Sequence, residues 1–220
     1  MDEIKKDTYM RLIESAGKLF AKKGFKETTV REICEHADAN IASVNYYFRD
    51  KKKLFFEVLK YVIEKSEEKF PLDRTYDEFD TPEEKLHEFV KDTVMRRFSP
   101  ELPQWFGRLL TREALMEIPD IKQLMMNQHR RIGTFFKPFM AEMLNADADS
   151  MIVRLCETSI IGNMRFLTGP LFIEHHPLHN KEIEGDLVDK LIDFLTDYSL
   201  SSIEGIRDKL QQEGSEKYEF

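Results

Sequence analysis

Apolar residues recur at steps of three and four along almost the whole chain, and this spacing most restricts the fold. The first such stripe comprises Tyr9, Leu12, Ile13, Ala16, Leu19 and Phe20. Residues spaced in this way fall on one face of an amphipathic helix. The sequence shows neither strand-like alternation nor a glycine-rich phosphate loop. It therefore predicts an all-α fold.

Two short helices are predicted directly after the first long one. Gly24 suits the end of the first helix, and Thr29 with Glu32 three residues later forms a capping box that starts the second. After a short turn at residues 38–39, Asn40 is a good N-cap for the third helix. A short helix, a tight turn and a second short helix predict a helix-turn-helix, although this pattern alone is only moderately specific.

The third helix has one apolar side and one unusual outer side. On a helical wheel, Ile41, Val44 and Phe48 form a ridge that we expect to pack on the first two helices. The positions expected to point largely outward are Ala42, Ser43, Tyr46 and Tyr47, with Asn45 at the border. Small residues allow a helix to enter the DNA major groove, and tyrosine hydroxyls and asparagine amides can contact phosphates.

The charge is divided unevenly along the chain. The whole chain has a net charge of −8, but residues 1–65 carry 14 Lys/Arg and 11 Asp/Glu, whereas residues 66–220 carry 19 and 30. Lys51, Lys52 and Lys53 lie at the predicted N-terminus of a fourth helix, where they disfavour the helix dipole but favour a bound phosphate. Taken alone, these features favour two interpretations about equally. The N-terminal part binds DNA, or its charged face is merely solvated.

The segment from Tyr9 to Lys60 resembles the DNA-binding domain of the tetracycline-repressor (TetR) family. The resemblance is carried by "LFAKKGFKETTVREI" and by "YYFRDKKKLF", and it covers about a quarter of the chain. It implies that Thr28 contacts a phosphate, that Thr29 caps the second helix and that Lys51 contacts another phosphate. It also implies that Ile41, Ala42 and Ser43 read bases, and that Asn45, Tyr46 and Tyr47 hold the DNA backbone.

Two positions depart from the family pattern. Asp38 occupies a turn position where the family usually has glycine, so the turn geometry is open to adjustment. Ile41 is apolar at a position that is often polar, and its role is divided between the core ridge and contact with a thymine methyl group.

We divide the chain into a helix-turn-helix domain at residues 1–50, a connecting helix at 51–70 and a larger helical domain at 71–220. A break in the pattern at residues 70–80 supports the last boundary. Beyond it, helices are predicted at about 81–98, from 103 to before 119, at 119–144 with a kink at Pro138, at 151–167 and at 183–210.

The resemblance implies that the larger domain binds a small effector and forms a homodimer through its last two helices. The dimer would place two recognition helices about one DNA turn apart. An apolar or amphipathic effector is expected, because aromatic residues and methionines are frequent in the middle helices. The candidate pocket residues are Phe98, Trp105, Phe106, Leu109, Phe136, Asn163 and Phe166. Arg96, Arg97, Arg108 and Arg112 are candidate polar anchors, but for most of them exposed salt bridges to Glu101 or Glu113 are the favoured interpretation.

Two other classes of function remain open at this stage. His175, His176 and His179, together with Glu174, have the composition of a metal site and would suit a metal-dependent helical hydrolase. Pro177 indicates a loop, however, and the default is a polar connection between helices. A helical interaction module that does not bind DNA is the other alternative. We expect no enzyme activity, resident metal or cofactor.

Localisation follows from two absences in the sequence. No run of 18 apolar residues exists, and the N-terminus lacks the apolar segment of a signal peptide. We therefore expect a cytoplasmic protein without a membrane partner. Its operator would be double-stranded DNA.

Overall fold

The structure is a computed structural model that describes residues 3–110, 118–169, 175–179, 181 and 183–214. The regular secondary structure within these ranges is α-helical, as the apolar spacing predicts. The helices are α1 (Glu3–Lys23), α2 (Val30–His36), α3 (Ile41–Phe48), α4 (Lys51–Lys69), α5 (Pro82–Phe98), α6 (Trp105–Leu110), α7 (Pro119–Leu144), α8 (Met151–Leu167) and α9 (Asp186–Glu213).

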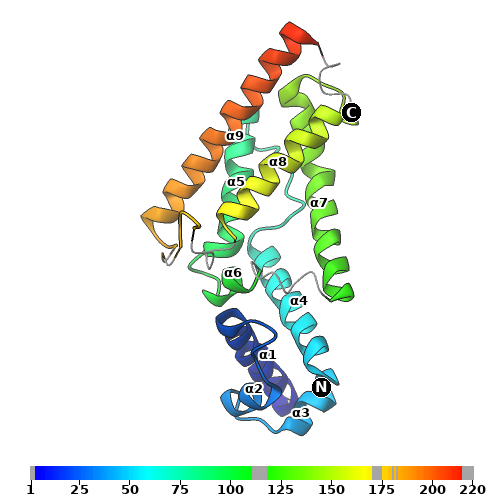
Figure 1. Cartoon of the computed structure of the whole chain (residues 1–220), viewed down its shortest axis with the longest axis vertical. Coiled ribbons are helices and arrows are strands. Elements are labelled where there is room, and N and C mark those ends of the chain that lie inside the picture. The colour runs from blue at the N-terminus through cyan, green and yellow to red at the C-terminus, as the bar shows by residue number, and fades with distance from the viewer. Residues whose placement is uncertain (1–2, 111–117, 170–174, 180, 182, 215–220) are drawn as a thin grey trace.

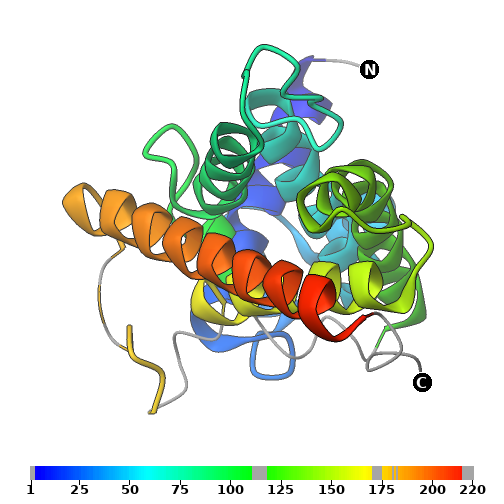
Figure 2. The ribbon, with the colours of Figure 1, turned by 90° about the horizontal axis from the view of Figure 1, so that it is seen from above.

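The helices form an elongated molecule with α1–α3 at one end (Figure 1). From there α4 leads toward the other end, where α5, α7, α8 and α9 lie together. The view along the long axis shows α9 running across the other helices of that end (Figure 2). It packs mainly against α5 and also contacts α7 and α8. The long helix α9 therefore covers one side of the larger domain.

Local capping explains where several helices begin. Thr29 accepts a hydrogen bond from the backbone N–H of Glu32, whose carboxylate accepts one from the backbone N–H of Thr29. Thr81 and Glu84 form the same capping box at the start of α5, with Pro82 at the first helical position. Each arrangement satisfies backbone donors that a helix start leaves unpaired, so these start signals are confirmed.

Two hydrophobic cores lie along the molecule. The N-terminal core contains the buried apolar residues of α1–α4, together with Leu102, Phe106, Leu109 and Ile121 from further along the chain. The C-terminal core is built from α5, α7, α8 and α9. Because α6 and the start of α7 pack into the N-terminal core, side chains from the larger domain help to form that core. The predicted domain boundaries at residues 50 and 70 stay predictions.

The segment between α4 and α5 is fixed by one buried carboxylate. Asp92 on α5 accepts hydrogen bonds from the hydroxyl of Tyr76 at 2.8 Å and from the guanidinium of Arg74 at 3.1 Å. Burial and the neighbouring carboxylate raise the pKa of Tyr76. Arg96 adds hydrogen bonds from its Nε to the carbonyl of Phe70 and from its Nη2 to that of Pro71. The linker is therefore tied to α5 along its length.

Some helix limits differ from the predictions. The helix expected from Pro103 begins at Trp105 and is seen to Leu110, and the rest of its predicted course lies outside the described residues. The last helix begins at Asp186 rather than 183, because Gly185 before it has a positive φ of 53°, and it continues to Glu213. Pro138 lies inside one continuous helix, α7.

Candidate nucleic-acid interface

The turn between α2 and α3 is short and closed by backbone hydrogen bonds. Asp38 has a φ of 47°, a left-handed conformation that glycine adopts most easily and that Asp tolerates better than most other residues. The N–H of Ala39 donates to the carbonyl of Cys34 at 2.9 Å, and Asn40 caps α3 through the N–H of Ala42. The turn therefore keeps the left-handed geometry although it lacks glycine.

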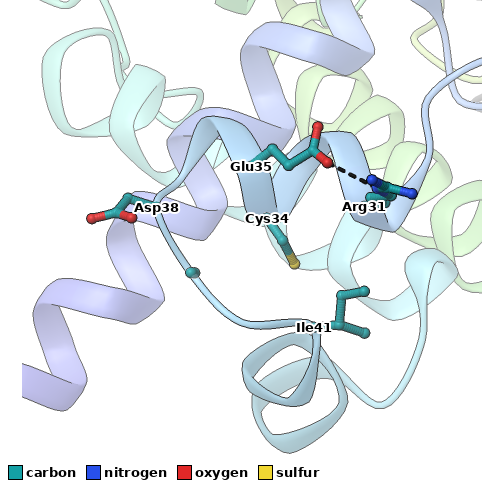
Figure 3. Close-up of a pocket in the computed structure, with 6 residues that line it drawn as sticks. Arg31, Cys34, Glu35, Asp38 and Ile41 are labelled. Atoms are coloured by element: carbon teal, nitrogen blue, oxygen red, sulfur yellow. Dashed lines mark hydrogen bonds and ion pairs between the residues drawn. The ribbon is translucent and has the colours of Figure 1, made fainter.

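Fewer apolar residues of α3 are buried than the sequence predicts. Val44 and Phe48 are buried in the N-terminal core, but Ile41 is 48% exposed. The side chain of Ile41 borders a shallow surface depression with Arg31, Cys34 and Glu35 of α2 (Figure 3). Ile41 lies in the first turn of α3, beyond the reach of the core. The prediction that it belongs to the packed ridge is wrong, and its side chain is free to contact another molecule.

The outer side of α3 exposes only some of the residues that were expected there. Ala42, Asn45 and Tyr46 are exposed, and the exposed fraction of Tyr46 is 71%. Ser43 and Tyr47 are half-buried. The ring of Tyr47 contacts Tyr46 edge-on at 4.9 Å and Tyr9 of α1 at 5.8 Å between centroids. The aromatic contacts hold Tyr47 in place and leave Tyr46 directed away from the protein.

Thr28 does not have the role that the resemblance implies. Its side chain is fully buried, and its hydroxyl donates to the carbonyl of Gly24 at 2.7 Å, with the carbonyl of Leu19 also within 3.3 Å. A buried hydroxyl with backbone partners cannot reach a phosphate. Thr28 instead fixes the loop between α1 and α2. Thr29 is exposed, and its side chain caps α2 as implied.

Lys51 is also used inside the protein. Its Nζ donates to the carbonyls of Phe25 and Thr28, each at 2.9 Å, and lies 4.4 Å from the centre of the Phe25 ring. The carbonyl of Lys26 lies at 3.5 Å. With its donors directed into this loop, Lys51 joins α4 to the α1–α2 connection. This geometry contradicts a direct phosphate contact by Lys51.

Two neighbouring cations are better placed for a phosphate. Arg49 ends α3 with a φ of 68°, and Lys52 lies in the first turn of α4. Both side chains are exposed, and among the described residues neither forms an ion pair. Lys53, by contrast, pairs with Glu57 at 3.8 Å. The sequence alone could not tell which members of the basic run point outward.

The predicted pocket residues do not gather around one site. Phe106 and Leu109 are buried in the N-terminal core, with Trp105 packed against it, whereas Phe136 is buried in the C-terminal core. Phe98 packs against the C-terminal core, Asn163 is half-buried on α8, and Phe166 is 52% exposed. The prediction of a shared pocket for these seven residues is therefore wrong. Aromatic residues at helical spacing mostly fill the two cores.

The histidine segment is a packed connection in its described part. His176 is buried, with Nε2 3.0 Å from the carbonyl oxygen of Phe166 and Nδ1 accepting from the N–H of Leu178 at 3.1 Å. Both ring nitrogens therefore have backbone partners, so neither is available to a metal. Within the described residues, no group of three His, Cys, Asp or Glu side chains could hold a metal ion. Glu174 lies outside the described residues.

Comparison with known families identifies both parts of the chain. The sequence model for bacterial regulatory proteins of the tetR family matches residues 12–58. The model for the C-terminal domain of the HTH-type transcriptional dual regulator CecR matches residues 82–206, more than half of the chain. The protein belongs to the TetR family of transcriptional regulators. The resemblance seen in the N-terminal motif is therefore confirmed.

A curated relative is similar over the N-terminal part only. It is the probable HTH-type transcriptional regulator YttP of Bacillus subtilis (strain 168), 50% identical over 48 residues. The match covers 22% of this chain and 23% of the relative, so it spans about a quarter of the relative's length.

Several solved structures are similar over most of the chain. A TetR-like regulator from Rhodococcus sp. RHA1 has a TM-score of 0.67 at 16% identity, over 90% of this chain and 96% of that one. AibR in complex with isovaleryl coenzyme A and operator DNA has 0.66 at 15%, over 87% and 97%. FadR from Bacillus subtilis in complex with stearoyl-CoA has 0.62 at 17%, over 88% and 98%. At these identities the likeness shows the fold.

None of the helices in the described ranges combines the length and the apolar character that a membrane crossing requires.

The role of Lys51 predicts a stability effect. Lys51→Met removes the hydrogen bonds to the Phe25 and Thr28 carbonyls, and we expect the free energy of unfolding to fall by about 1 kcal/mol. Lys52→Met is the matched control, because an exposed side chain without an ion pair should change it by less than about 0.5 kcal/mol. Urea unfolding followed by circular dichroism measures both, and equal stability of the two variants would contradict the assignment.

Proposed function

We propose that this TetR-family protein is a ligand-responsive DNA-binding regulator that acts as a repressor in the cytoplasm. The exposed face of α3 carries this proposal: small side chains near its start are followed by outward-facing polar groups and exposed cations. Such a helix can lie in the major groove while its flanking groups hold phosphates. Membership of a family of transcriptional regulators also favours this role over catalysis.

Each part of this face has a separate task in the proposal. Ile41, Ala42 and Ser43 approach base edges, and the exposed Ile41 is suited to a thymine methyl group. Asn45, Tyr46 and Tyr47 contact the sugar-phosphate backbone, as the resemblance implies. We add Arg49 and Lys52 as phosphate contacts in place of Lys51.

Dimerisation is proposed through α8 and α9. In α9, Leu191, Leu195 and Ile203 are buried in the C-terminal core, whereas Phe194 and Tyr198 are 55% and 49% exposed. Their rings stack at 6.3 Å between centroids. On α8, Met151 and Leu155 are exposed as well. Large apolar groups exposed on adjacent helices favour a second copy packed in C2 symmetry, which would present two α3 helices to a palindromic operator.

A route for the response to a ligand runs through α5 and α6. Arg96 near the end of α5 holds the carbonyls of Phe70 and Pro71 at the end of α4. A Cβ atom on Gly107 of α6 would lie 2.7 Å from the carbonyl oxygen of Arg97, so these backbones are in close contact. A shift of α5 would therefore move both α4 and α6. Since both helices pack on α1, the spacing of the two α3 helices would change.

The effector is proposed to be a small amphipathic molecule held by the larger domain. AibR, which shares the fold, is described with isovaleryl coenzyme A and operator DNA, and FadR with stearoyl-CoA. These ligands support a regulator of this architecture that responds to a molecule with apolar and polar parts. A helical interaction module without DNA binding is the alternative, and it would show no salt-dependent binding to any duplex.

The role of Tyr46 can be tested by removing one hydroxyl group. Tyr46→Phe should weaken binding to a selected operator and to unrelated duplexes by a similar factor, about three- to tenfold, because a phosphate contact carries no sequence information. Fluorescence anisotropy at fixed moderate salt measures both affinities. Tyr61→Phe, which removes a hydroxyl from α4 away from α3, is the control. Unaltered affinity of the Tyr46 variant would exclude the contact.

The proposed dimer interface can be tested by placing a charge on it. Phe194→Glu should convert the dimer into monomers in sedimentation velocity, because a buried carboxylate without a partner is unfavourable. Helix content should be unchanged, since Phe194 is exposed in the single chain. Met126→Glu on α7, where the methionine is 45% exposed, is the matched control. If the Phe194 variant stays dimeric, the interface lies elsewhere.

A further inference from the structure

Arg97 on α5 is a half-buried cation that has no carboxylate partner among the described residues. Its Nη1 donates to the hydroxyl of Thr168 at 2.6 Å, and that hydroxyl donates to the carbonyl of Met164. Its Nε is buried and has no hydrogen-bond partner among the described residues. Thr168 is fully buried. One end of the guanidinium is therefore anchored, while a charged N–H group stays unsatisfied.

The electrostatic surroundings of Arg97 are positive. Burial, and then the charges of Arg165 and Arg96, lower the pKa of Arg97 to about 10. It stays charged at neutral pH, so the cost of burying the charge is not avoided by losing the proton. No carboxylate in the described part of the chain offsets this charge. A buried guanidinium is ordinarily paired with an acid.

Two more basic side chains are electrostatically linked to Arg97 from other helices, because the charge of Arg165 acts on Arg97 and also on His129. Arg165 lies on α8 and His129 on α7, and α8 packs against both α5 and α7 (Figure 1). Burial and then the charge of Arg165 lower the pKa of His129. By residue exposure Arg165 and His129 are more open to solvent than Arg97. The basic cluster, defined as Arg97, Arg165 and His129, thus extends from the interior toward the surface.

Two other arginines of the same domain do have carboxylate partners. Arg74 is held by Asp92 and Glu78, and Arg131 pairs with Glu67 at 2.7 Å. The domain is acidic overall, so carboxylates are plentiful on its helices. Arg97 has no such carboxylate among the described residues, so its buried Nε–H is available to an acidic group from outside the chain.

We propose that the basic cluster is the subsite for the acidic head group of the effector, a carboxylate or a phosphate ester. Arg97 supplies its free Nε–H to the anion while Thr168 fixes the orientation of its guanidinium. Arg165 and His129 provide further donors nearer to solvent. Charge-assisted hydrogen bonds of this kind are strong, and a guanidinium suits the planar, divided charge of both head groups. The apolar part of the effector would then lie among the helices of the larger domain.

This inference rests on the proposed function, because the anion is assigned to the regulatory ligand. The position of Arg97 fits that role. Its neighbour Arg96 holds the end of α4, and its own carbonyl lies against Gly107 of α6. An anion drawn onto Arg97 would therefore act on the last turn of α5, which contacts both helices that lead to α1.

Four ligands with the same octyl chain test the head group directly. Octanoate, octyl phosphate, octanol and octyltrimethylammonium are titrated into the full-length protein by isothermal calorimetry, each below its micelle concentration. We expect at least one anion to bind more tightly than octanol and the cation. A preference for octyl phosphate would assign a phosphate and a preference for octanoate a carboxylate. Failure of both anions to bind, or tighter binding of octanol or the cation, would overturn the proposal.

Substitutions then locate the site. Arg97→Met should weaken binding of the preferred anion by about tenfold or more and leave the affinity for octanol unchanged. Arg165→Met should weaken it less, because that side chain is more exposed. Arg154→Met, which removes an exposed arginine elsewhere on α8, should have no effect. An Arg97 variant that binds the anion as well as the wild type would place the head group elsewhere.

The stability of Arg97→Met without ligand separates a binding role from a structural one. A buried cation kept for a ligand does not stabilise the free protein, and Thr168 retains its bond to Met164. We therefore expect the Tm of the variant to equal or exceed that of the wild type. A clear drop in Tm, together with unchanged anion affinity, would show that Arg97 serves only the fold.

Operator binding is measured separately, so the two proposals can fail independently. Anion binding that depends on Arg97 but does not change DNA affinity would retain the subsite and overturn the regulatory role. DNA binding that is released by other compounds, with no anion bound at Arg97, would retain the regulator and overturn the subsite.

Discussion

The contact between Trp105 and Gly17 holds the two ends of this molecule together. A Cβ atom on Gly17 would lie 2.2 Å from atoms of the indole ring, so only glycine allows α6 to pack this closely on α1. Phe106 beside it contacts Tyr61 of α4 edge-on, with ring centroids 5.9 Å apart. The short helix α6 thus belongs to the larger domain by sequence and to the N-terminal core by packing. Any movement of the larger domain that displaces α6 must act on α1.

Charged side chains are divided between the interior and the surface of the molecule. In the N-terminal part, Lys51 is directed inward to fix a loop, whereas Arg49 and Lys52 stay exposed beside α3. In the larger domain Arg74 and Arg131 have acidic partners, whereas Arg97 has none among the described residues. A net negative chain can therefore present a positive DNA-facing end and a positive interior site. The position of individual charges, not their sum, carries the function.

The sequence predicts the features that depend on neighbouring residues. Helix periodicity, the capping boxes at Thr29 and Thr81 and the N-cap at Asn40 all involve contacts within a few residues, so they are readable before folding. The motifs at residues 19–33 and 46–55 also identified the family correctly. The left-handed turn at Asp38 kept its geometry because Asp tolerates that conformation.

The predictions that the structure contradicts concern side chains whose partners are distant in sequence. Lys51 reaches carbonyls 23 and 26 residues away, and Thr168 receives the guanidinium of a residue 71 positions earlier. A helical wheel placed Ile41 on the core side but could not show that the core ends before it. The aromatic residues assigned to one pocket are divided between two cores. Spacing within a helix shows which residues share a face, but it does not show which other helix that face packs against.

Selection of operators from random duplexes tests the central claim most directly. Purified protein is incubated with a random duplex library at moderate salt, and the bound DNA is sequenced after several rounds. The account predicts enrichment of an inverted repeat whose half-sites are centred about one helical turn apart, as a C2 dimer with two α3 helices requires. Failure to enrich any inverted repeat would contradict the claim that this dimer reads DNA through α3.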